Sequence, residues 1–345
     1  MIQSVSLIEA SNLTKVFRRA DKGPGLRGSL RHLAERRYVE HVAVDHIDLS
    51  IDPGEAVAYV GPNGAGKSTT VKMLTGILVP TDGDIHVAGR VPHRERIENS
   101  RNIGVVFGQR TQLWWDLPVR DSLELLRDMH GMTQSRYDKS LERLDAVLGL
   151  ADLLSVMARK LSLGQRMRAD LAAALIHEPS IVYLDEPTIG LDISVKDRVR
   201  EFARHLVAEG TTVLLTTHDL DDIEDICRRI IIIDDGRFVY DGDLESVKNT
   251  YARECAMHFQ LAAGAPVASV SARLPEATVT LGDSERELIV TFDRFALSTG
   301  TVLNAVLPDG EVLDVSISEP AIEDVVRKVY AGELRLDPGN GKAAT

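Results

Sequence analysis

Residues 61–68 read Gly-Pro-Asn-Gly-Ala-Gly-Lys-Ser, which fits the phosphate-binding pattern G-x-x-x-x-G-K-[ST]. The apolar run 56–60 before it is typical of a buried strand, and residues 68–76 after it have apolar side chains at helical spacing. The glycines let consecutive backbone N–H groups turn toward one phosphate, and a following helix adds the positive end of its dipole. The segment therefore predicts a site for a nucleoside triphosphate.

The side chains that end this loop have distinct expected roles. Lys67 should reach the β- and γ-phosphates, and the Ser68 hydroxyl should hold Mg²⁺. A second apolar run, 181–186, ends in two acids, Asp185 and Glu186. We expect Asp185 to bind Mg²⁺ through its water shell and Glu186 to orient and polarise an attacking water. For either acid alone, an acidic turn after a core strand would be an adequate explanation.

The composition limits the class of protein. The 345 residues suffice for about two domains of ~150 residues each. A net charge of −12 argues against a surface that binds nucleic acid or anionic lipid nonspecifically. Two cysteines without metal-binding spacing fit a reducing cytosol. We expect neither a signal peptide nor a membrane span, because no stretch is apolar enough for one, so another chain would do any crossing.

Short apolar runs alternate with helix-like segments up to about residue 250. Continuous apolar character predicts buried parallel strands at 103–107, 181–184, 213–216 and 230–233. Helical spacing predicts helices near 119–131, 135–149 and 164–177. The segments 5–17 and 42–51 instead alternate like strands of a half-exposed sheet, and a further strand is expected at 85–88. This order predicts a doubly wound α/β core.

The sequence changes in character near residue 250. Residues 251–330 contain no glycine-rich loop, and strand-like runs occur at 288–292 and 312–317. A helix is expected from Glu319 to Tyr330. We interpret 251–330 as a small separate α+β domain and 331–345 as a disordered tail.

Four more motifs accompany the phosphate loop and the two acids in a fixed order. They are Gln109 after the run 103–107, Leu-Ser-Leu-Gly-Gln at 161–165, Leu191-Asp192, and His218 after the run 213–216. Together the motifs resemble the nucleotide-binding subunit of an ATP-binding cassette (ABC) transporter. The resemblance implies an ABC ATPase domain over 1–250, with a P-loop NTPase core, an antiparallel β subdomain and a helical subdomain at about 110–177.

The resemblance also implies the roles of the motif residues. Glu186, His218 and the Q-loop residue Gln109 would be catalytic, and Ser68, Gln109 and Asp185 would hold Mg²⁺. Contacts to ATP would come from a set that two subunits share, namely Gly61, Pro62, Asn63, Gly64, Ala65, Gly66, Lys67, Ser68, Thr69, Ser162, Gly164, Gln165 and Asp192. The subunits would pair head to tail, so that Ser162 and Gly164 of one reach the γ-phosphate held by the other. A helix N-terminus is a suitable anion site for that purpose.

One position departs from the family pattern, and the residue that stacks on adenine is open between two aromatic side chains. The usual glycine at the third signature position is Leu163, which we expect to face away from the phosphate because Ser162 and Gly164 are kept. The resemblance also implies that an aromatic side chain near the end of the first strand stacks on adenine. Phe17 fits that position, and Tyr38 is the alternative because an insertion follows Phe17; ordinary core packing would explain either residue equally well.

Three segments bear on partners. Residues 15–41 carry eight basic and three acidic side chains, and an insertion at about 18–41 is predicted to form a basic amphipathic helix. That helix would contact a membrane surface or a permease, or remain a solvated surface helix. The pair Trp114-Trp115 is expected to contact a permease or to cap the core of the helical subdomain. Residues 251–330 resemble the domain appended to export-type subunits.

The combined prediction is an ATP-hydrolysing subunit of an export-type ABC transporter. It would work as a homodimer, or paired with a similar subunit, on the cytoplasmic face of the cell membrane, with separately encoded permeases and no nucleic acid. The cargo stays open between a drug-like compound and a cell-surface glycan. One alternative is a soluble ABC ATPase without a transport role. The other is a small-molecule kinase, which would need neither the 161–165 motif nor His218.

Overall fold

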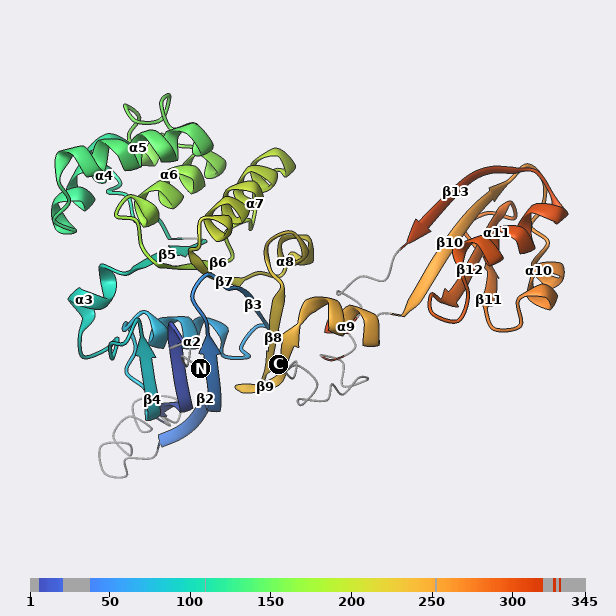
Figure 1. Ribbon diagram of the computed structural model, residues 1–345, viewed down its shortest axis with the longest axis horizontal. Helices are drawn as coiled ribbons and strands as arrows, with labels where there is room; N and C mark the ends of the chain where they lie inside the picture. The colour runs from blue at the N-terminus through green and yellow to red at the C-terminus, as the bar shows by residue number, and fades with distance from the viewer. Residues whose placement is uncertain are drawn as a thin grey trace, which may run out of the picture. The chain divides into compact units, whose positions relative to one another are not determined.

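The computed structural model describes residues 6–20, 38–108, 110–251 and 253–318, together with Val325, Val326 and Val329. The chain folds into two compact units, and the division between them falls between Gly242 and Asp243. Figure 1 shows the helices and strands of both units. Among the described residues, no helix is both long and apolar enough to cross a bilayer.

The first unit is built on a six-stranded sheet. Its strands, in spatial order, are β5 (Ile103–Phe107), β6 (Ile181–Asp185), β7 (Thr212–Thr216), β3 (Ala56–Val60), β8 (Arg229–Asp234) and β9 (Arg237–Asp243). The pairs from β5 to β8 are parallel, and the residues of β3 and β7 are all buried, as their continuous apolar sequence predicts. Because these strands are parallel, the segments that follow β3, β5, β6 and β7 meet at one edge of the sheet.

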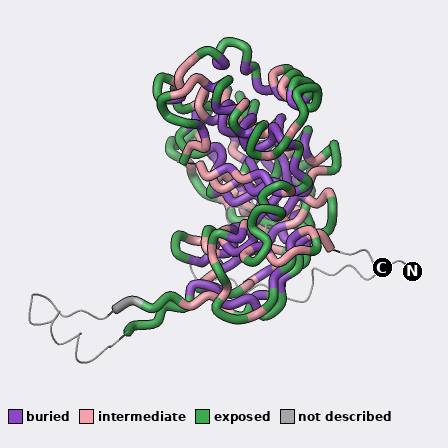
Figure 2. Tube along the Cα trace, turned by 90° about the vertical axis from the view of Figure 1, so that its left-hand side faces the viewer, coloured by how far each residue is buried: buried purple, intermediate pink, exposed green. Residues whose placement is uncertain are grey.

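A three-stranded antiparallel sheet forms the second layer of this unit. Strand β1 (Ile8–Ala20) lies between β2 (Tyr38–Ile51) and β4 (Asp82–Val87). One core cluster joins this sheet to α2 (Lys67–Leu74) and to the six-stranded sheet, with Leu13, Val71 and Tyr183 among its buried members. The far ends of β1 and β2 project from this core and are exposed (Figure 2).

The insertion predicted at about 18–41 is strand, not helix, at both of its ends. Strand β1 continues to Ala20 and β2 begins at Tyr38, because the two strands stay paired over Arg18↔Glu40 and Ala20↔Tyr38. An ion pair of 2.9 Å between Arg18 Nε and Glu40 Oε1 supports that pairing. Residues 21–37, between these two strands, lie outside the described residues, so the predicted helix stays a prediction.

The three helices predicted between 119 and 177 are confirmed. They are α4 (Val119–Met129), α5 (Gln134–Leu148) and α6 (Leu163–Leu175). Helix α5 is capped by the Thr133 side chain and ends at Gly149, whose φ of 61° is the left-handed conformation that glycine adopts readily. The prediction did not include α3 (Arg96–Ser100), α7 (Ile193–Ala208) or α8 (Leu220–Ile226).

The second unit is an α+β structure. It begins with α9 (Leu244–Tyr251), and its antiparallel sheet has the order β11 (Thr278–Leu281), β12 (Glu287–Asp293), β10 (Glu254–Leu261) and β13 (Val312–Ser318). Helices α10 (Val267–Arg273) and α11 (Thr299–Val306) bury Val270 and Val302 against Phe259 of β10. The strands predicted at 288–292 and 312–317 are thus β12 and β13.

Part of the C-terminal prediction falls on residues that the structure does not describe. Val325, Val326 and Val329 are helical and buried, within the helix predicted for 319–330. The rest of that segment and the predicted tail at 331–345 lie outside the described residues.

Candidate active site

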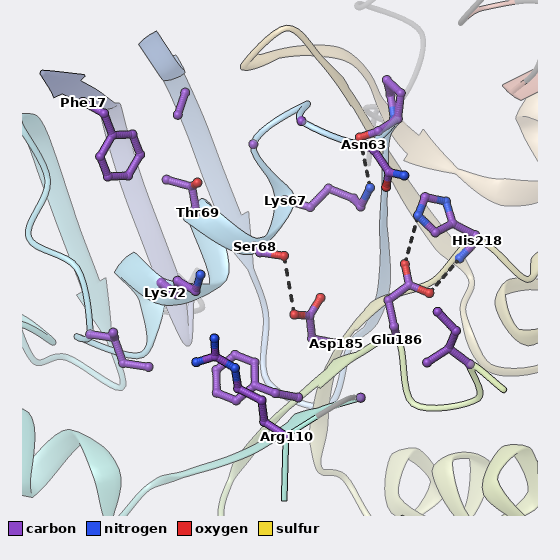
Figure 3. A pocket seen from close by; sticks show the side chains of 18 of the residues that line it. Phe17, Asn63, Lys67, Ser68, Thr69, Lys72, Arg110, Asp185, Glu186 and His218 are labelled. Atoms are coloured by element: carbon purple, nitrogen blue, oxygen red, sulfur yellow. Dashed lines mark hydrogen bonds and ion pairs between the residues drawn. The ribbon is translucent and has the colours of Figure 1, made fainter. Parts of the chain in front are cut away.

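A pocket of about 640 Å³ lies where the segments after β3, β5, β6 and β7 meet. Phe17 is at one end, Glu186 and His218 are at the other, and the first residues of α2 lie between them (Figure 3). The pocket thus brings together residues that are up to 201 positions apart in the sequence, from Phe17 to His218.

The loop between β3 and α2 has a backbone that needs glycine. Gly66 has a φ of 109°, and a Cβ there would lie 2.4 Å from the Ala43 carbonyl oxygen. A Cβ on Gly61 would lie 2.3 Å from the Ile233 carbonyl oxygen. Both distances are shorter than any real contact, so only glycine lets the loop wrap closely around the start of α2.

Most of the nine loop residues expected to contact ATP line the pocket. The exceptions are Gly61 and Ala65, which are both buried. The Lys67 ammonium donates hydrogen bonds to the carbonyl oxygens of Gly61 and, at 3.2 Å, of Pro62. Burial lowers the pKa of Lys67, while the charges of Glu186 and Asp185 act in the opposite direction. The loop therefore holds a cation in place at the centre of the pocket.

Asp185, at the end of β6, faces the first turn of α2. Its Oδ1 accepts a hydrogen bond of 2.5 Å from the Thr216 hydroxyl, and its Oδ2 accepts one of 3.5 Å from Ser68 Oγ. Hydroxyl and carboxylate oxygens are the ligands that Mg²⁺ prefers. No three His, Cys, Asp or Glu side chains gather into a metal site in the described part of the chain, so phosphate oxygens and waters would have to complete the coordination.

Glu186 has an unusual backbone that aims its side chain into the pocket. Its φ is +55°, which is uncommon for a residue other than glycine. The Glu186 N–H donates to the Thr216 carbonyl at 2.8 Å, and a Cβ on the neighbouring Gly108 would lie 2.3 Å from the Glu186 carbonyl oxygen. Such conformations persist where the surroundings fix them, and they are frequent at functional sites.

The Glu186 carboxylate contacts His218 twice (Figure 3). Its Oε2 accepts a hydrogen bond of 3.3 Å from the His218 backbone N–H, and its Oε1 lies 3.2 Å from His218 Nε2. Burial raises the pKa of Glu186, although His218 and Lys67 partly counteract this. A carboxylate with a raised pKa is a stronger base, which suits the role of polarising a water.

This shift predicts how stability depends on pH. Because folding raises the pKa of Glu186, its ionisation lowers the free energy of unfolding as the pH rises through the folded-state pKa. Glu186→Gln should therefore melt at a higher temperature than the wild type near neutral pH. Below the ordinary carboxyl pKa of 4.5, Glu186 is protonated in both the folded and the unfolded state. The difference in melting temperature between the variant and the wild type should then vanish. Thermal unfolding without nucleotide, from about pH 4 to about pH 8, measures it. A variant that is less stable at neutral pH would contradict the shift.

Of the two aromatic candidates for stacking on adenine, Phe17 lines the pocket and Tyr38 does not. Pairing of β1 with β2 places Phe17 opposite His41, two residues from Ala43, whose carbonyl oxygen packs against Gly66. Tyr38 is five residues before Ala43, about 16 Å along an extended strand. Lys15 Nζ lies 5.4 Å from the centroid of the Phe17 ring.

We expect Phe17→Ala to weaken ATP binding about 10-fold, because an aromatic side chain that stacks on a base contributes on the order of 1–3 kcal/mol. Tyr38→Ala is the matched control and should leave the affinity unchanged. Equilibrium binding of a fluorescent ATP analogue measures both variants. If the tyrosine variant alone lost affinity, the two residues would have to exchange roles.

Several residues of the pocket were not expected from the sequence. They are His41, Ala43, Lys72, Ile77, Phe107, Gly108, Arg110 and Ile189. Lys72 could have been found, since it is four residues after Ser68 and so shares a helix face with it. His41 depends on strand register, which the sequence does not reveal. Gln109 lies outside the described residues, but its neighbours Gly108 and Arg110 both line the pocket.

The signature residues Ser162, Gly164 and Gln165 do not line this pocket. They start α6, where Ser162 Oγ accepts from the Gln165 N–H at 3.3 Å and Gln165 Oε1 accepts from the Ser162 N–H at 2.9 Å. This reciprocal cap fixes the helix start, and Ser162 is exposed. The signature segment therefore presents a rigid helix N-terminus away from the pocket of its own chain.

Asp192 does not line the pocket either. It caps α7 by accepting from the Val195 N–H at 3.0 Å. A Cβ on Gly164 would lie 3.0 Å from Val195, so the first turns of α6 and α7 are closely packed. The side chain of Leu163 lies beside Gly190: a Cβ on Gly190 would be 3.2 Å from Leu163 Cδ2. Leu163 does not line the pocket.

The two tryptophans lie between β5 and α4. Trp114 and Trp115 are 38% and 50% exposed, whereas the preceding Leu113 is buried. The backbone of Trp115 is fixed, since its carbonyl accepts a hydrogen bond of 3.1 Å from the Arg159 N–H. The guanidinium carbon of Arg166 is 5.9 Å from the centroid of the Trp115 ring. The exposed rings are thus held on the surface of the first unit.

The chain is similar to known proteins over most of its length. A family model described as ABC transporter matches residues 44–189. A daunorubicin resistance ATP-binding protein from Streptomyces coeruleorubidus is 36% identical over 310 residues, which cover 88% of this chain and 96% of that protein. A Nod factor export ATP-binding protein I from Paraburkholderia xenovorans is 36% identical over 209 residues, which cover 60% of this chain and 68% of that protein.

Two solved structures are also similar. One is an ATP binding subunit of an ABC transporter, with a TM-score of 0.60 and 25% identity over 71% of this chain and 93% of that one. The other is a dimeric ATP-binding cassette in a post-hydrolysis state bound to ADP and Pi, with a TM-score of 0.58 and 25% identity over 69% of this chain and 98% of that one.

Proposed function

This chain belongs to the ATP-binding subunits of ABC transporters, and from this premise we propose that it couples ATP hydrolysis to export of a substrate through separately encoded permeases. Export is supported by two relatives, one a daunorubicin resistance ATP-binding protein and the other a Nod factor export ATP-binding protein. The substrate would be a drug-like compound or a cell-surface glycan, and the name of the resistance protein favours the first of these. The site of action would be the cytoplasmic face of the cell membrane.

One observation carries the proposal: the site of a single chain is incomplete. The pocket holds the loop, both acids and His218, but it lacks Ser162, Gly164 and Gln165. Those residues begin a 13-residue helix that has no acid in its first turn, and such a helix N-terminus attracts an anion. In a head-to-tail dimer, this N-terminus would meet the γ-phosphate in the pocket of the partner subunit. The dimeric form of the similar cassette supports this arrangement.

Within the composite site, the residues of the chain divide the work. Lys67 and the loop N–H groups bind the phosphates, and Phe17 stacks on the base. Ser68 and Asp185 would hold Mg²⁺, together with Gln109, and the ion supplies charge neutralisation on the phosphate oxygens. Glu186 orients a water for attack on the γ-phosphorus and polarises its O–H bond, while His218 hydrogen-bonds the γ-phosphate. The products are ADP and phosphate.

The permease would bind at the exposed tryptophans. Trp114 and Trp115 are large, rigid side chains on a backbone that hydrogen bonds fix, and aromatic anchors of this kind often dominate interfaces. Their exposure favours a partner over the alternative that they cap the core of the helical subdomain.

Copurification from membranes tests the proposal. The tagged chain is expected to bring a polytopic permease out of detergent-solubilised membranes of its own host. The double variant Trp114→Ala/Trp115→Ala should lose this permease and still bind ATP, whereas Phe295→Ala, which removes another exposed aromatic ring, should retain it. Absence of any permease with the wild-type chain would favour the soluble alternative.

A further inference from the structure

One buried carboxylate of the first unit is not part of the pocket. Asp222 lies in the first turn of α8 and has no exposed surface. Its Oδ2 accepts hydrogen bonds from the hydroxyls of Thr188, at 2.5 Å, and Thr217, at 3.2 Å. Its Oδ1 accepts one from Arg200 Nε, at 2.5 Å. The two carboxyl oxygens of Asp222 thus accept from all three partners, and the bond from the guanidinium is charge-assisted.

The partners of Asp222 belong to the segments that carry the reactive groups. Thr188 is two residues after Glu186 and four before Asp192, and Thr217 directly precedes His218. Both threonines are 2% exposed. One carboxylate thus connects the segment after β6 to the segment after β7. The distances between Glu186 and His218, 3.2 and 3.3 Å, depend on how these two segments lie against each other.

Further hydrogen bonds near Asp222 fix the segment 217–219, which contains His218. The Asp219 N–H donates to the Thr217 hydroxyl oxygen at 2.9 Å. Asp219 in turn accepts from Lys196 Nζ at 2.5 Å and from Arg200 Nη2 at 3.1 Å. Lys196 and Arg200 both project from α7, the helix that Asp192 caps. The cluster therefore ties three elements together: α7, the segment 186–192 and the segment 217–219.

We propose that Asp222 is a positioning residue for hydrolysis, which holds Glu186 and His218 at a fixed mutual distance through Thr188 and Thr217. The proposal rests on the function proposed above, because it assigns no chemistry to Asp222 itself. It predicts a specific pattern: the loss of these bonds should misplace the water-orienting carboxylate without changing the loop that binds ATP. A misplacement of about 1 Å can slow catalysis roughly 10²-fold.

The test compares four variants of the full chain in steady-state ATPase assays and in thermal unfolding. Asp222→Asn keeps the shape of the side chain and loses its charge, and it should lower kcat about 10- to 100-fold with little change in KM. Thr188→Val should lower kcat in the same way, while Thr188→Ser keeps the hydroxyl and should restore it. Asp241→Asn is the matched control, since Asp241 also pairs with an arginine, Arg229, but does not line the pocket.

The outcomes separate positioning from plain stability. A lower kcat in Asp222→Asn and Thr188→Val, with normal rates in Thr188→Ser and Asp241→Asn, supports the proposal. If Asp222→Asn does not fold, the two threonine variants decide by themselves. Equal kcat in Thr188→Val and wild type, or equal losses in Asp222→Asn and Asp241→Asn, would overturn it. Failure of the proposed function would show differently, as copurification of no permease with the wild-type chain.

Discussion

The Glu186→Gln variant is expected to bind ATP and to hydrolyse it roughly 10²- to 10⁴-fold more slowly than the wild type, the range that a positioned acid–base group contributes. Glutamine has the shape of glutamate and can still accept the hydrogen bond from the His218 N–H. It cannot accept a proton, so the water would lose its base. Since the phosphate loop is unchanged, the affinity for ATP should remain.

Single-turnover hydrolysis and equilibrium ATP binding measure the two effects separately. Glu178→Gln is a suitable control, because Glu178 also has a positive φ, of 56°, and does not line the pocket. Its side chain pairs instead with Arg136 Nε at 2.7 Å. Turnover should be normal in the control. Normal turnover in Glu186→Gln would remove Glu186 from the role assigned to it.

The Lys67→Ala variant is expected to lose ATP affinity by roughly 10²-fold, because charge-assisted hydrogen bonds to a buried anion contribute about 1.5–3 kcal/mol. The ammonium is already held in place by the carbonyl oxygens of Gly61 and Pro62, so little order is lost when a phosphate binds. Lys139→Ala removes the same charge from the exposed face of α5 and should have no effect. Calorimetric titration with ATP and Mg²⁺ compares them. Equal affinities in the two variants would contradict the phosphate role.

The contiguous parts of the site could be predicted from the sequence because local chemistry determines them. The loop 61–69 needs glycines at fixed spacing, and continuous apolar residues indicate the buried strands β3, β6 and β7. Helices α4, α5 and α6 have apolar faces that a short window contains, and the side chains of Thr133 and Ser162 cap α5 and α6. Each of these features depends on residues within one turn or one strand.

The remainder depends on contacts between segments far apart in the sequence. The choice of Phe17 over Tyr38 follows from the register in which β1 pairs with β2. The sequence does not reveal this register, because 17 residues, 21–37, separate the two strands. Strand β10 alternates buried Met257 and Phe259 with more polar residues, so its run looks only moderately apolar. The bonds of Asp222 join residues 34 and 22 positions away, and no local pattern marks them.

Head-to-tail pairing can be tested most directly by mixing two inactive variants. Lys67→Ala damages the phosphate loop and keeps the signature segment, while Ser162→Arg blocks the signature segment and keeps the loop. In a mixed dimer, one of the two sites would combine an intact Lys67 with an intact Ser162 from the other protomer. The measurement is ATPase activity after the two differently tagged variants are mixed and the mixed dimers are purified.

A composite site predicts that the mixed dimers hydrolyse ATP although neither variant does so alone. If instead each chain used only its own Ser162, every protomer in the mixture would still carry one defect. Mixed dimers that form and remain inactive would contradict the composite site.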